Sequence, residues 1–391
     1  KTNEQGYIAI AKLYRAILFY NLTLTFGDIP YSEAVRGEEK ITQPKYDTQE
    51  TVLAGILKEL EEANSLISNG TVKGDIIYNG DTSKWKKFIN SFRLKVLITL
   101  SKKDKVGGYN IASEFAKIAT SEPLMMSIDD NAQLSFFDSA DSRYTTFNDS
   151  NYGSSVYMAN YFVDLFKNRE DPRIFTFADQ TTGAKEAGKP ITDFTAYNGG
   201  NPVSPYSDNA ALVAQKNISK VNIRFYKDAT NEPSNILSYT ELQFILAEAS
   251  ARGWISSSAK THYDNAITSS FDFYNKYVKN ASVYFSGFDI NTYLTSSLVA
   301  YNTAGNLNEQ VEQILTQKYM TMFHQGQSTA YYDYLRTGYP AFPLPSGMSQ
   351  APARYRYPQT EYNYNSANLK DALQKQFGGK DEIQSLTWWL K

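Results

Sequence analysis

The side chains best suited to binding chemistry are aromatic residues that stand beside polar ones in the loop-rich middle of the chain. The candidate ligand-binding set is Phe136, Phe137, Asp141, Arg143, Tyr144, Phe147, Asn148, Asn151, Tyr152, Tyr157, Tyr197 and Tyr206. A sugar would stack its C–H faces on the rings while Asn, Asp and Arg bond its hydroxyls. A peptide would pack its side chains on the rings and bond its backbone to the amides. The pattern predicts a binding surface and leaves both ligand classes open.

A later group of aromatic residues, ranked behind the first, comprises Tyr284, Phe285, Phe288 and Tyr293. The chain has no cysteine, which excludes thiolate zinc sites and cysteine nucleophiles. No G-x-S-x-G elbow is present, and residues 378–381 (GGKD) lack the upstream glycine and the Ser or Thr of a phosphate-binding loop. We interpret them as a turn. Both histidines, His262 and His324, are expected inside helices, without metal-ligand spacing.

Carboxylates leave two further hypotheses open. Asp138 and Asp141 could supply the two acids of a glycosidase. Together with Asp129 and Asp130 they could instead hold a structural calcium ion, although the D-x-D-x-D-G spacing is absent. Solvated loop acids are the simpler interpretation. We therefore expect a protein that is not an enzyme, with no cofactor and no metal site beyond such a calcium ion.

Composition describes a globular chain of 391 residues with 42% hydrophobic and 20% charged residues. A net charge of -2 provides no global field for phosphate backbones, so nucleic acid is not an expected partner. No uninterrupted apolar run reaches the roughly 18 residues of a membrane span. Because Lys1 lies close to a helix without an initiator Met or signal peptide, we expect a processed or truncated N-terminus.

The binding residues need a scaffold, and residues 238–277 predict its clearest element, a helical hairpin. Ser256 to Ser258 suit the N-cap of the second helix, and Gly253 suits the left-handed residue that ends the first. The small, small, aromatic, small positions of a tetratricopeptide repeat are filled by Ala247, Ala259, Tyr263 and Ala266.

Apolar periodicity predicts further helices at residues 6–26, 47–67, 82–101, 110–120 and 307–325, and a short one at 369–377. The first is apolar on most sides, so we expect it to be sandwiched between neighbours. Asp47 is the expected N-cap of the second, with Glu50 completing a capping box.

Periodicity fails after Pro123, where one helix, Tyr157 to Lys167, is expected. The domain plan is an N-terminal helical repeat part (1–122), a loop-rich insertion as candidate ligand-binding region (123–235), a second helical repeat part (236–335) and a turn-rich C-terminal segment (336–391). A second insertion interrupts the third part at about 283–306. The predicted fold is mainly α, a tetratricopeptide-like helical repeat scaffold with long loop-rich insertions.

Five stretches in order along the chain resemble the SusD/RagB family of nutrient-binding outer-membrane lipoproteins. They are residues 15–34 (RAILFYNLTLTFGDIPYSEA), 85–102, 238–253, 314–343 and 354–391. The resemblance implies a SusD-like fold, a lipid anchor preceding this chain, exposure at the cell surface, and a SusC-like TonB-dependent transporter as partner. It also implies an oligosaccharide ligand, with capture of a peptide or another nutrient as the alternative within the family. A hydrolase that uses two carboxylates of the insertion is the alternative outside the family.

Overall fold

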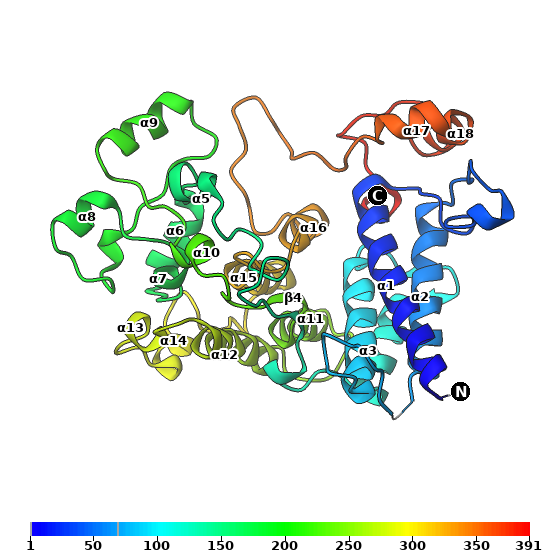
Figure 1. Ribbon diagram of the computed structural model, residues 1–391, viewed down its shortest axis with the longest axis horizontal. Coiled ribbons are helices and arrows are strands. Elements are labelled where there is room, and N and C mark those ends of the chain that lie inside the picture. Colours follow the sequence, from blue (N-terminus) through cyan, green and yellow to red (C-terminus); the bar gives the residue numbers. More distant parts are fainter. Residues whose placement is uncertain (1, 69) are drawn as a thin grey trace.

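The computed structural model describes residues 2–68 and 70–391, and most of its regular structure is helical (Figure 1). The scaffold helices are α1 (Thr2–Phe26), α2 (Gln49–Leu66), α3 (Thr82–Thr99), α4 (Ile111–Ser121), α11 (Tyr239–Ala251), α12 (Ala259–Tyr277), α15 (Leu307–Met320) and α16 (Thr329–Thr337). Each expected scaffold helix is present. The mainly α fold with loop-rich insertions is confirmed.

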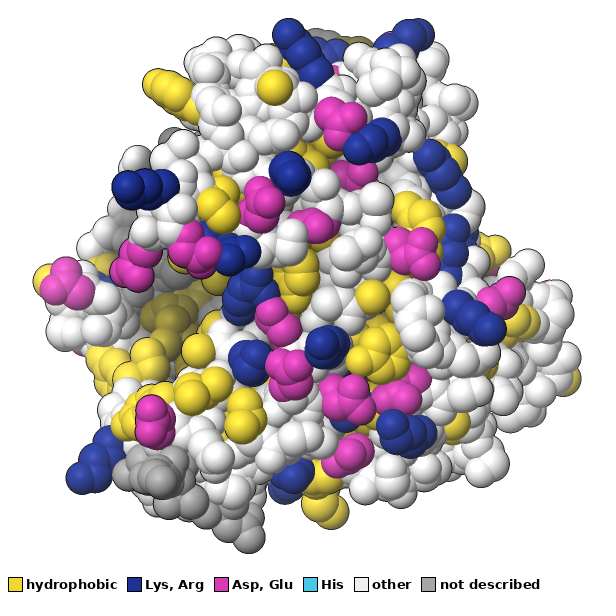
Figure 2. All heavy atoms as spheres, turned by 90° about the vertical axis from the view of Figure 1, so that its right-hand side faces the viewer, with side chains coloured by type: hydrophobic (Ala, Val, Ile, Leu, Met, Phe, Trp, Pro, Cys, Tyr) yellow, Lys and Arg dark blue, Asp and Glu magenta, His cyan; other side chains and the backbone are white. Residues whose placement is uncertain are grey.

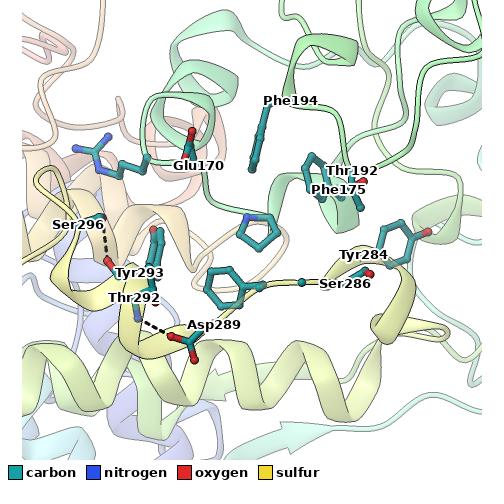
Figure 3. Close-up of a pocket in the computed structure, with 14 residues that line it drawn as sticks. Glu170, Phe175, Thr192, Phe194, Tyr284, Ser286, Asp289, Thr292, Tyr293 and Ser296 are labelled. Carbon is teal, nitrogen blue, oxygen red and sulfur yellow. Dashed lines mark hydrogen bonds between the residues drawn. The ribbon is translucent and has the colours of Figure 1, made fainter.

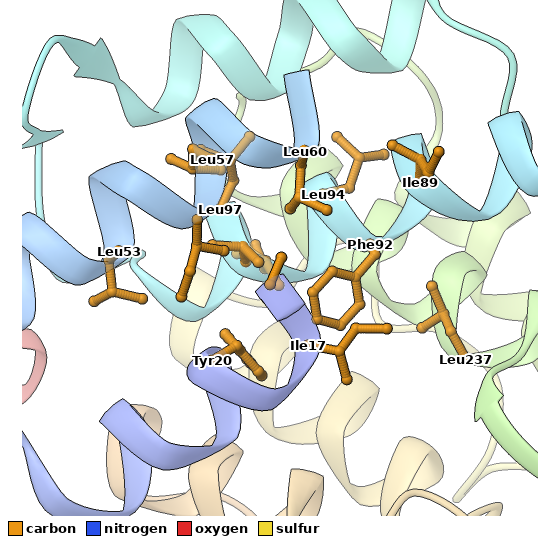
Figure 4. Packing of buried hydrophobic residues seen from close by; sticks show 14 of the residues in the cluster. Ile17, Tyr20, Leu53, Leu57, Leu60, Ile89, Phe92, Leu94, Leu97 and Leu237 are labelled. Atoms are coloured by element: carbon orange, nitrogen blue, oxygen red, sulfur yellow. The ribbon is translucent and has the colours of Figure 1, made fainter. Parts of the chain in front are cut away.

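The N-terminal helices α1, α2 and α3 enclose the largest hydrophobic cluster. Figure 4 shows Ile17 and Tyr20 of α1 packed among leucines of α2 and α3 and against Phe92. One face of α1 stays open, since Leu18 is 62% exposed. The predicted N-cap of α2 is wrong. Thr48 caps α2 by accepting from Thr51 N, because the Asp47 carboxylate accepts from Ser32 N at 2.7 Å instead.

The central hairpin of α11 and α12 forms as its sequence predicts. Ser238 and Ser258 cap the two helices with their side chains, and Gly253 has a φ of 72°. The side chains of Ala247, Tyr263 and Ala266 are buried where the two helices meet the second insertion. Close packing of the helices explains the small residues at 247 and 266, and Tyr263 fills the space beside them.

The segment after residue 123 contains more helix than expected. Its helices are α5 (Ser150–Ser154), α6 (Asn160–Lys167), α7 (Ile174–Phe177), α8 (Thr182–Glu186), α9 (Tyr206–Ala214) and α10 (Arg224–Lys227). Only α6 was expected, because helices of four to nine residues are too short for a hydrophobic period to show. Strand β3 (Ala132–Leu134) pairs antiparallel with β4 (Ser234–Leu237) and brings the two ends of the segment together. A separate hairpin joins β1 (Lys105–Val106) and β2 (Tyr109–Asn110).

The remaining short helices lie at opposite ends of the molecule. Helices α13 (Ala281–Tyr284) and α14 (Ile290–Thr295) lie beside α7 and α12, whereas α17 (Gln359–Tyr364) and α18 (Ser366–Phe377) lie over the C-terminal end of α1 (Figure 1). Tyr357 ties the C-terminal segment to this end by donating to Asp28 O at 2.6 Å. His324 lies beyond the end of α15 with a φ of 56°, so its expected helical position is wrong, whereas His262 lies within α12.

A buried ionic network joins the two halves of the scaffold. Arg336 of α16 donates to Glu248 of α11 at 2.8 Å and to Asp333 at 2.8 Å. Asp333 also accepts from Lys318 of α15 at 2.8 Å, and Lys95 of α3 pairs with Glu241 of α11 at 2.9 Å. Burial alone would raise the pKa of Glu248, but the charge and hydrogen bonds of Arg336 lower it below its usual value. The carboxylate therefore stays charged inside the scaffold.

The surface over α1 and α2 carries interspersed charges of both signs (Figure 2). Lys12 of α1 pairs with Glu62 of α2 at 2.8 Å, and Arg15 pairs with Glu59. Of the helices that the structure describes, none combines the length and the apolar character that crossing a membrane requires.

Arg336→Ala is expected to lower the free energy of unfolding by about 3–5 kcal/mol, because it leaves Glu248 and Asp333 buried with fewer partners. Urea denaturation followed by circular dichroism measures the loss. The matched control is Arg356→Ala, which removes an exposed arginine and should change stability by less than about 0.5 kcal/mol. Equal losses in the two variants would show that the network does not stabilise the scaffold.

Asp28 generates a pH-dependent prediction. Burial raises its pKa from 3.8 to about 6, so the folded state binds a proton more tightly than the unfolded state, and stability contributed by this group rises as pH falls from about 7 to 4. Asp28→Asn keeps an acceptor for Gln49 N and removes the buried charge. The variant should be more stable than the parent at pH 7.5, by roughly 3 kcal/mol, with the gap closing near pH 4. Exposed Asp371→Asn should show no such gap in the same denaturation series.

Candidate functional site

A cavity of about 360 Å³ lies between the loop-rich segment and the second insertion. We refer to it as the insertion cavity. The first wall is formed by residues that follow α6, by α7 and by residues 192 and 194. The second wall is formed by the segment from α13 to α14. Figure 3 shows Phe175 and Phe194 on the first wall, with Tyr284 and Tyr293 on the second.

The first wall is shaped by a turn at the end of α6. Glu170 has a φ of 50°, which reverses the chain, and Pro172 follows it at the cavity surface. The Asp171 carboxylate accepts from Arg173 N at 3.0 Å and so leads the chain into α7, which carries Phe175. Phe194 belongs to a separate turn, and its ring lies 4.6 Å from that of Phe175.

The second wall depends on a glycine and a helix cap. Gly287 has a φ of 75°, a conformation that side-chain-bearing residues rarely adopt. Asp289 then caps α14 by accepting from Thr292 N at 2.7 Å, and this bond lowers the pKa of the carboxyl group. The preceding ring, Phe288, stacks on Phe271 of α12 at 4.4 Å. The scaffold thereby supports the aromatic floor of the cavity from behind.

The groups exposed in the insertion cavity are aromatic rings surrounded by a polar rim. Phe194, Tyr284 and Phe288 are half-buried, so each keeps part of its ring open to the cavity. The rim carries hydroxyl groups and charged groups from Arg169, Glu170, Thr192, Ser286, Asp289, Thr292 and Ser296. Apolar rings with a few hydrogen-bonding groups are typical of small-molecule sites, which measure about 300–1,000 Å³.

A buried ion pair lies directly behind the first wall. Arg173 and Asp171 are fully buried and pair at 2.5 Å. Burial alone would lower the pKa of Arg173, but the charge of Asp171 raises it. Tyr293, which lines the cavity, donates its hydroxyl to the same carboxylate. Burial and the Asp171 charge together raise the pKa of Tyr293 well above its ordinary value, so the phenol stays protonated.

None of the twelve sequence-predicted binding residues lines the insertion cavity. Tyr144 and Tyr197 are buried in the second hydrophobic cluster, so neither ring face is open to a ligand in this structure. Tyr197 supports the cavity indirectly, with its ring 5.2 Å from that of Phe175. Sequence alone could not separate these two from exposed tyrosines, because irregular segments have no period that reveals their buried side.

The structure brings part of the remaining set together on another surface. Phe136, Phe147 and Tyr152 are half-buried around Tyr144, and Arg143 lies over the Phe147 ring at 5.3 Å. Exposed residues of the same region are Phe137, Asp141, Asn148 and Asn151. Tyr157 lies apart near Lys220, and Tyr206 is 87% exposed at the start of α9. This surface stays a predicted binding site.

Of the later aromatic group, three members line the insertion cavity: Tyr284, Phe288 and Tyr293. Phe285 packs on Phe271 instead, at 5.7 Å. The sequence prediction missed the cavity residues between Arg169 and Phe194. The Asp-Pro-Arg turn at 171–173 was the available signal, since it marks where the chain reverses beside the cavity.

The acids considered for calcium have other partners. Asp129 pairs with Lys276 at 2.6 Å, Asp130 with Lys87 at 2.9 Å, and Asp138 with Arg143 at 2.7 Å. Throughout residues 2–68 and 70–391, no three His, Asp or Glu side chains converge as a metal ion requires. A structural calcium ion at these acids stays a prediction.

Comparisons with known proteins identify the family. The SusD-like family described as starch-binding and associating with the outer membrane matches residues 1–358. The chain belongs to this SusD-like family. General nutrient binding in association with the outer membrane is thus the function of its family, which is one of binding proteins. No curated protein matches the chain.

Solved structures of SusD-like proteins share the fold. One is an outer membrane protein of Bacteroides vulgatus ATCC 8482 that is described as involved in nutrient binding. It is 45% identical to this chain, with a TM-score of 0.95, and the match covers 99% of this chain and 85% of that protein. A SusD homologue of Bacteroides fragilis NCTC 9343 is 46% identical, with a TM-score of 0.92 over 100% and 85% of the two chains. A chitin-binding protein is 26% identical, with a TM-score of 0.76 over 98% and 80%.

Proposed function

We propose that this SusD-like protein binds an oligosaccharide in the insertion cavity and passes it, without cleaving it, to a SusC-like TonB-dependent transporter. In this proposal a lipid anchor holds the protein on the outer face of the outer membrane. The observation that carries the binding site is the cavity itself, with three half-buried rings facing a rim of hydroxyl and carboxylate groups.

The polar rim favours a sugar as the ligand. Hydroxyl and carboxylate oxygens accept hydrogen bonds from sugar hydroxyls, while the rings present flat apolar faces to C–H groups. A peptide bound as an added strand needs an open sheet edge, and the strands in the described residues are two to four residues long. The family description as starch-binding and the chitin-binding relative also support an oligosaccharide.

The surroundings of the two candidate acids, Asp138 and Asp141, favour binding without cleavage. Asp138 is exposed and already paired with Arg143, and Asp141 is exposed in the same loop. Glycoside hydrolysis needs two carboxyl groups that flank the scissile bond of the bound sugar. Neither acid lines the insertion cavity, so neither flanks a ligand bound there.

The test of the binding site is isothermal titration with maltoheptaose and chitohexaose, which represent starch and chitin fragments. Phe194→Ala and Tyr284→Ala should each weaken binding about tenfold, equivalent to ~1.4 kcal/mol, because each removes one stacking face. The matched control is Tyr206→Ala, which removes an exposed tyrosine outside the cavity and should leave affinity unchanged. The reverse pattern would move the site from the insertion cavity to the surface at the start of α9. If peptides rather than sugars co-purify with the protein, the ligand is a peptide and not an oligosaccharide.

The transporter proposal is tested in detergent-solubilised outer membranes. The anchored, affinity-tagged protein should co-purify with a TonB-dependent transporter, identified by mass spectrometry. Tyr284→Ala should co-purify equally well, because the substitution removes a ring that lines the ligand cavity. Recovery of the protein free of any transporter, under conditions that preserve other outer-membrane complexes, contradicts the proposal.

A further inference from the structure

The buried ion pair behind the insertion cavity connects four separate parts of the chain. Arg173 Nη1 donates to Ser270 of α12 at 3.0 Å, and Arg173 Nη2 donates to Gln317 of α15 at 3.2 Å. Its guanidinium also lies 4.7 Å from the centre of the Phe271 ring. The loop-rich segment is therefore attached to two scaffold helices through a single arginine side chain.

Tyr293 extends this connection to the second wall of the cavity. Its hydroxyl donates to Asp171, which in turn holds Arg173. Among the side-chain hydrogen bonds in the described residues, this is the one that joins residues 123–235 to residues 283–306. The two walls of the cavity come from these two segments, so this hydrogen bond is the polar side-chain contact that links the walls.

A buried ion pair is an expensive way to stabilise a core. Removing two charges from water costs several kcal/mol each, and apolar residues of similar volume often give equal or greater stability. An ion pair differs from apolar packing in direction, because each hydrogen bond fixes the position and orientation of both partners. Here the bonds connect the scaffold to the first wall through Arg173, and the first wall to the second through Asp171 and Tyr293.

We propose that Arg173, Asp171 and Tyr293 form a positioning chain that holds the two walls of the insertion cavity at a fixed separation and so preorganises it for its ligand. The ligand part of this proposal rests on the proposed function. A cavity whose walls are already fixed avoids the ordering cost of binding, so affinity depends on the chain even though Arg173 and Asp171 do not reach the ligand.

The test uses Tyr293→Phe, which keeps the ring on the cavity wall and removes only the hydroxyl. The matched control is Tyr301→Phe, since Tyr301 is a buried tyrosine of the same insertion whose hydroxyl has no hydrogen-bond partner. Amide hydrogen exchange is measured on the ligand-free proteins. We expect exchange of residues 169–173 and 284–296 to rise at least tenfold in Tyr293→Phe, with α2 and α3 unchanged, and no change in Tyr301→Phe.

Titration with maltoheptaose and chitohexaose supplies the second readout, with an expected tenfold loss of affinity in Tyr293→Phe alone. Unchanged exchange at the two walls, or an equal rise over the whole chain, overturns the positioning role, because a merely structural residue would act in one of these ways. If the parent protein binds neither sugar, the proposed function fails, and the exchange data by themselves still decide whether the chain holds the walls.

Discussion

The buried ionic network of the scaffold is the constraint on which the rest of the structure depends. It joins α3, α11, α15 and α16 through Lys95, Glu241, Glu248, Lys318, Asp333 and Arg336. Arg252 also pairs with Glu248, at 2.8 Å, so each charge in the network lies beside an opposite charge. Because an unpaired buried charge is costly, displacing one of the four helices would separate charges that stabilise each other in this arrangement.

Helix α15 carries that constraint to the insertion cavity. Lys318 faces the scaffold network, and the preceding residue, Gln317, accepts from Arg173 behind the cavity. Helix α12 contributes in the same way through Ser270 and through Phe271, which supports Phe288. The irregular cavity walls are thus positioned by regular helices. This arrangement is typical of binding sites, in which loops carry the contacts and a rigid scaffold fixes their places.

The sequence predicted the scaffold because its signals are local. Helical periodicity, the serine cap at 258 and the glycine at 253 act within one or two turns of chain, and all of them appear in the structure. The cavity depends on contacts between segments about 120 residues apart, such as Tyr293 with Asp171, which no local pattern encodes. Ranking the aromatic residues by their polar neighbours in sequence favoured the loop around Tyr144, although that ring is buried. The lower-ranked group supplied Tyr284, Phe288 and Tyr293, whereas Phe175 and Phe194 belonged to neither group.

Several tyrosines have a structural role, so a high tyrosine content does not by itself indicate a binding site. The hydroxyl of Tyr197 donates to Ile191 O, that of Tyr263 to Val299 O, and that of Tyr274 to Thr321 O. In each case a buried ring packs in a core while its hydroxyl satisfies a carbonyl of an irregular segment. Such carbonyls lack the partners that a helix or sheet would give them, and leaving them buried and unpaired is unfavourable. Tyrosine therefore orders long loops that have little regular structure. Tyr284 differs from these three tyrosines, because its ring is half-buried and lines the insertion cavity.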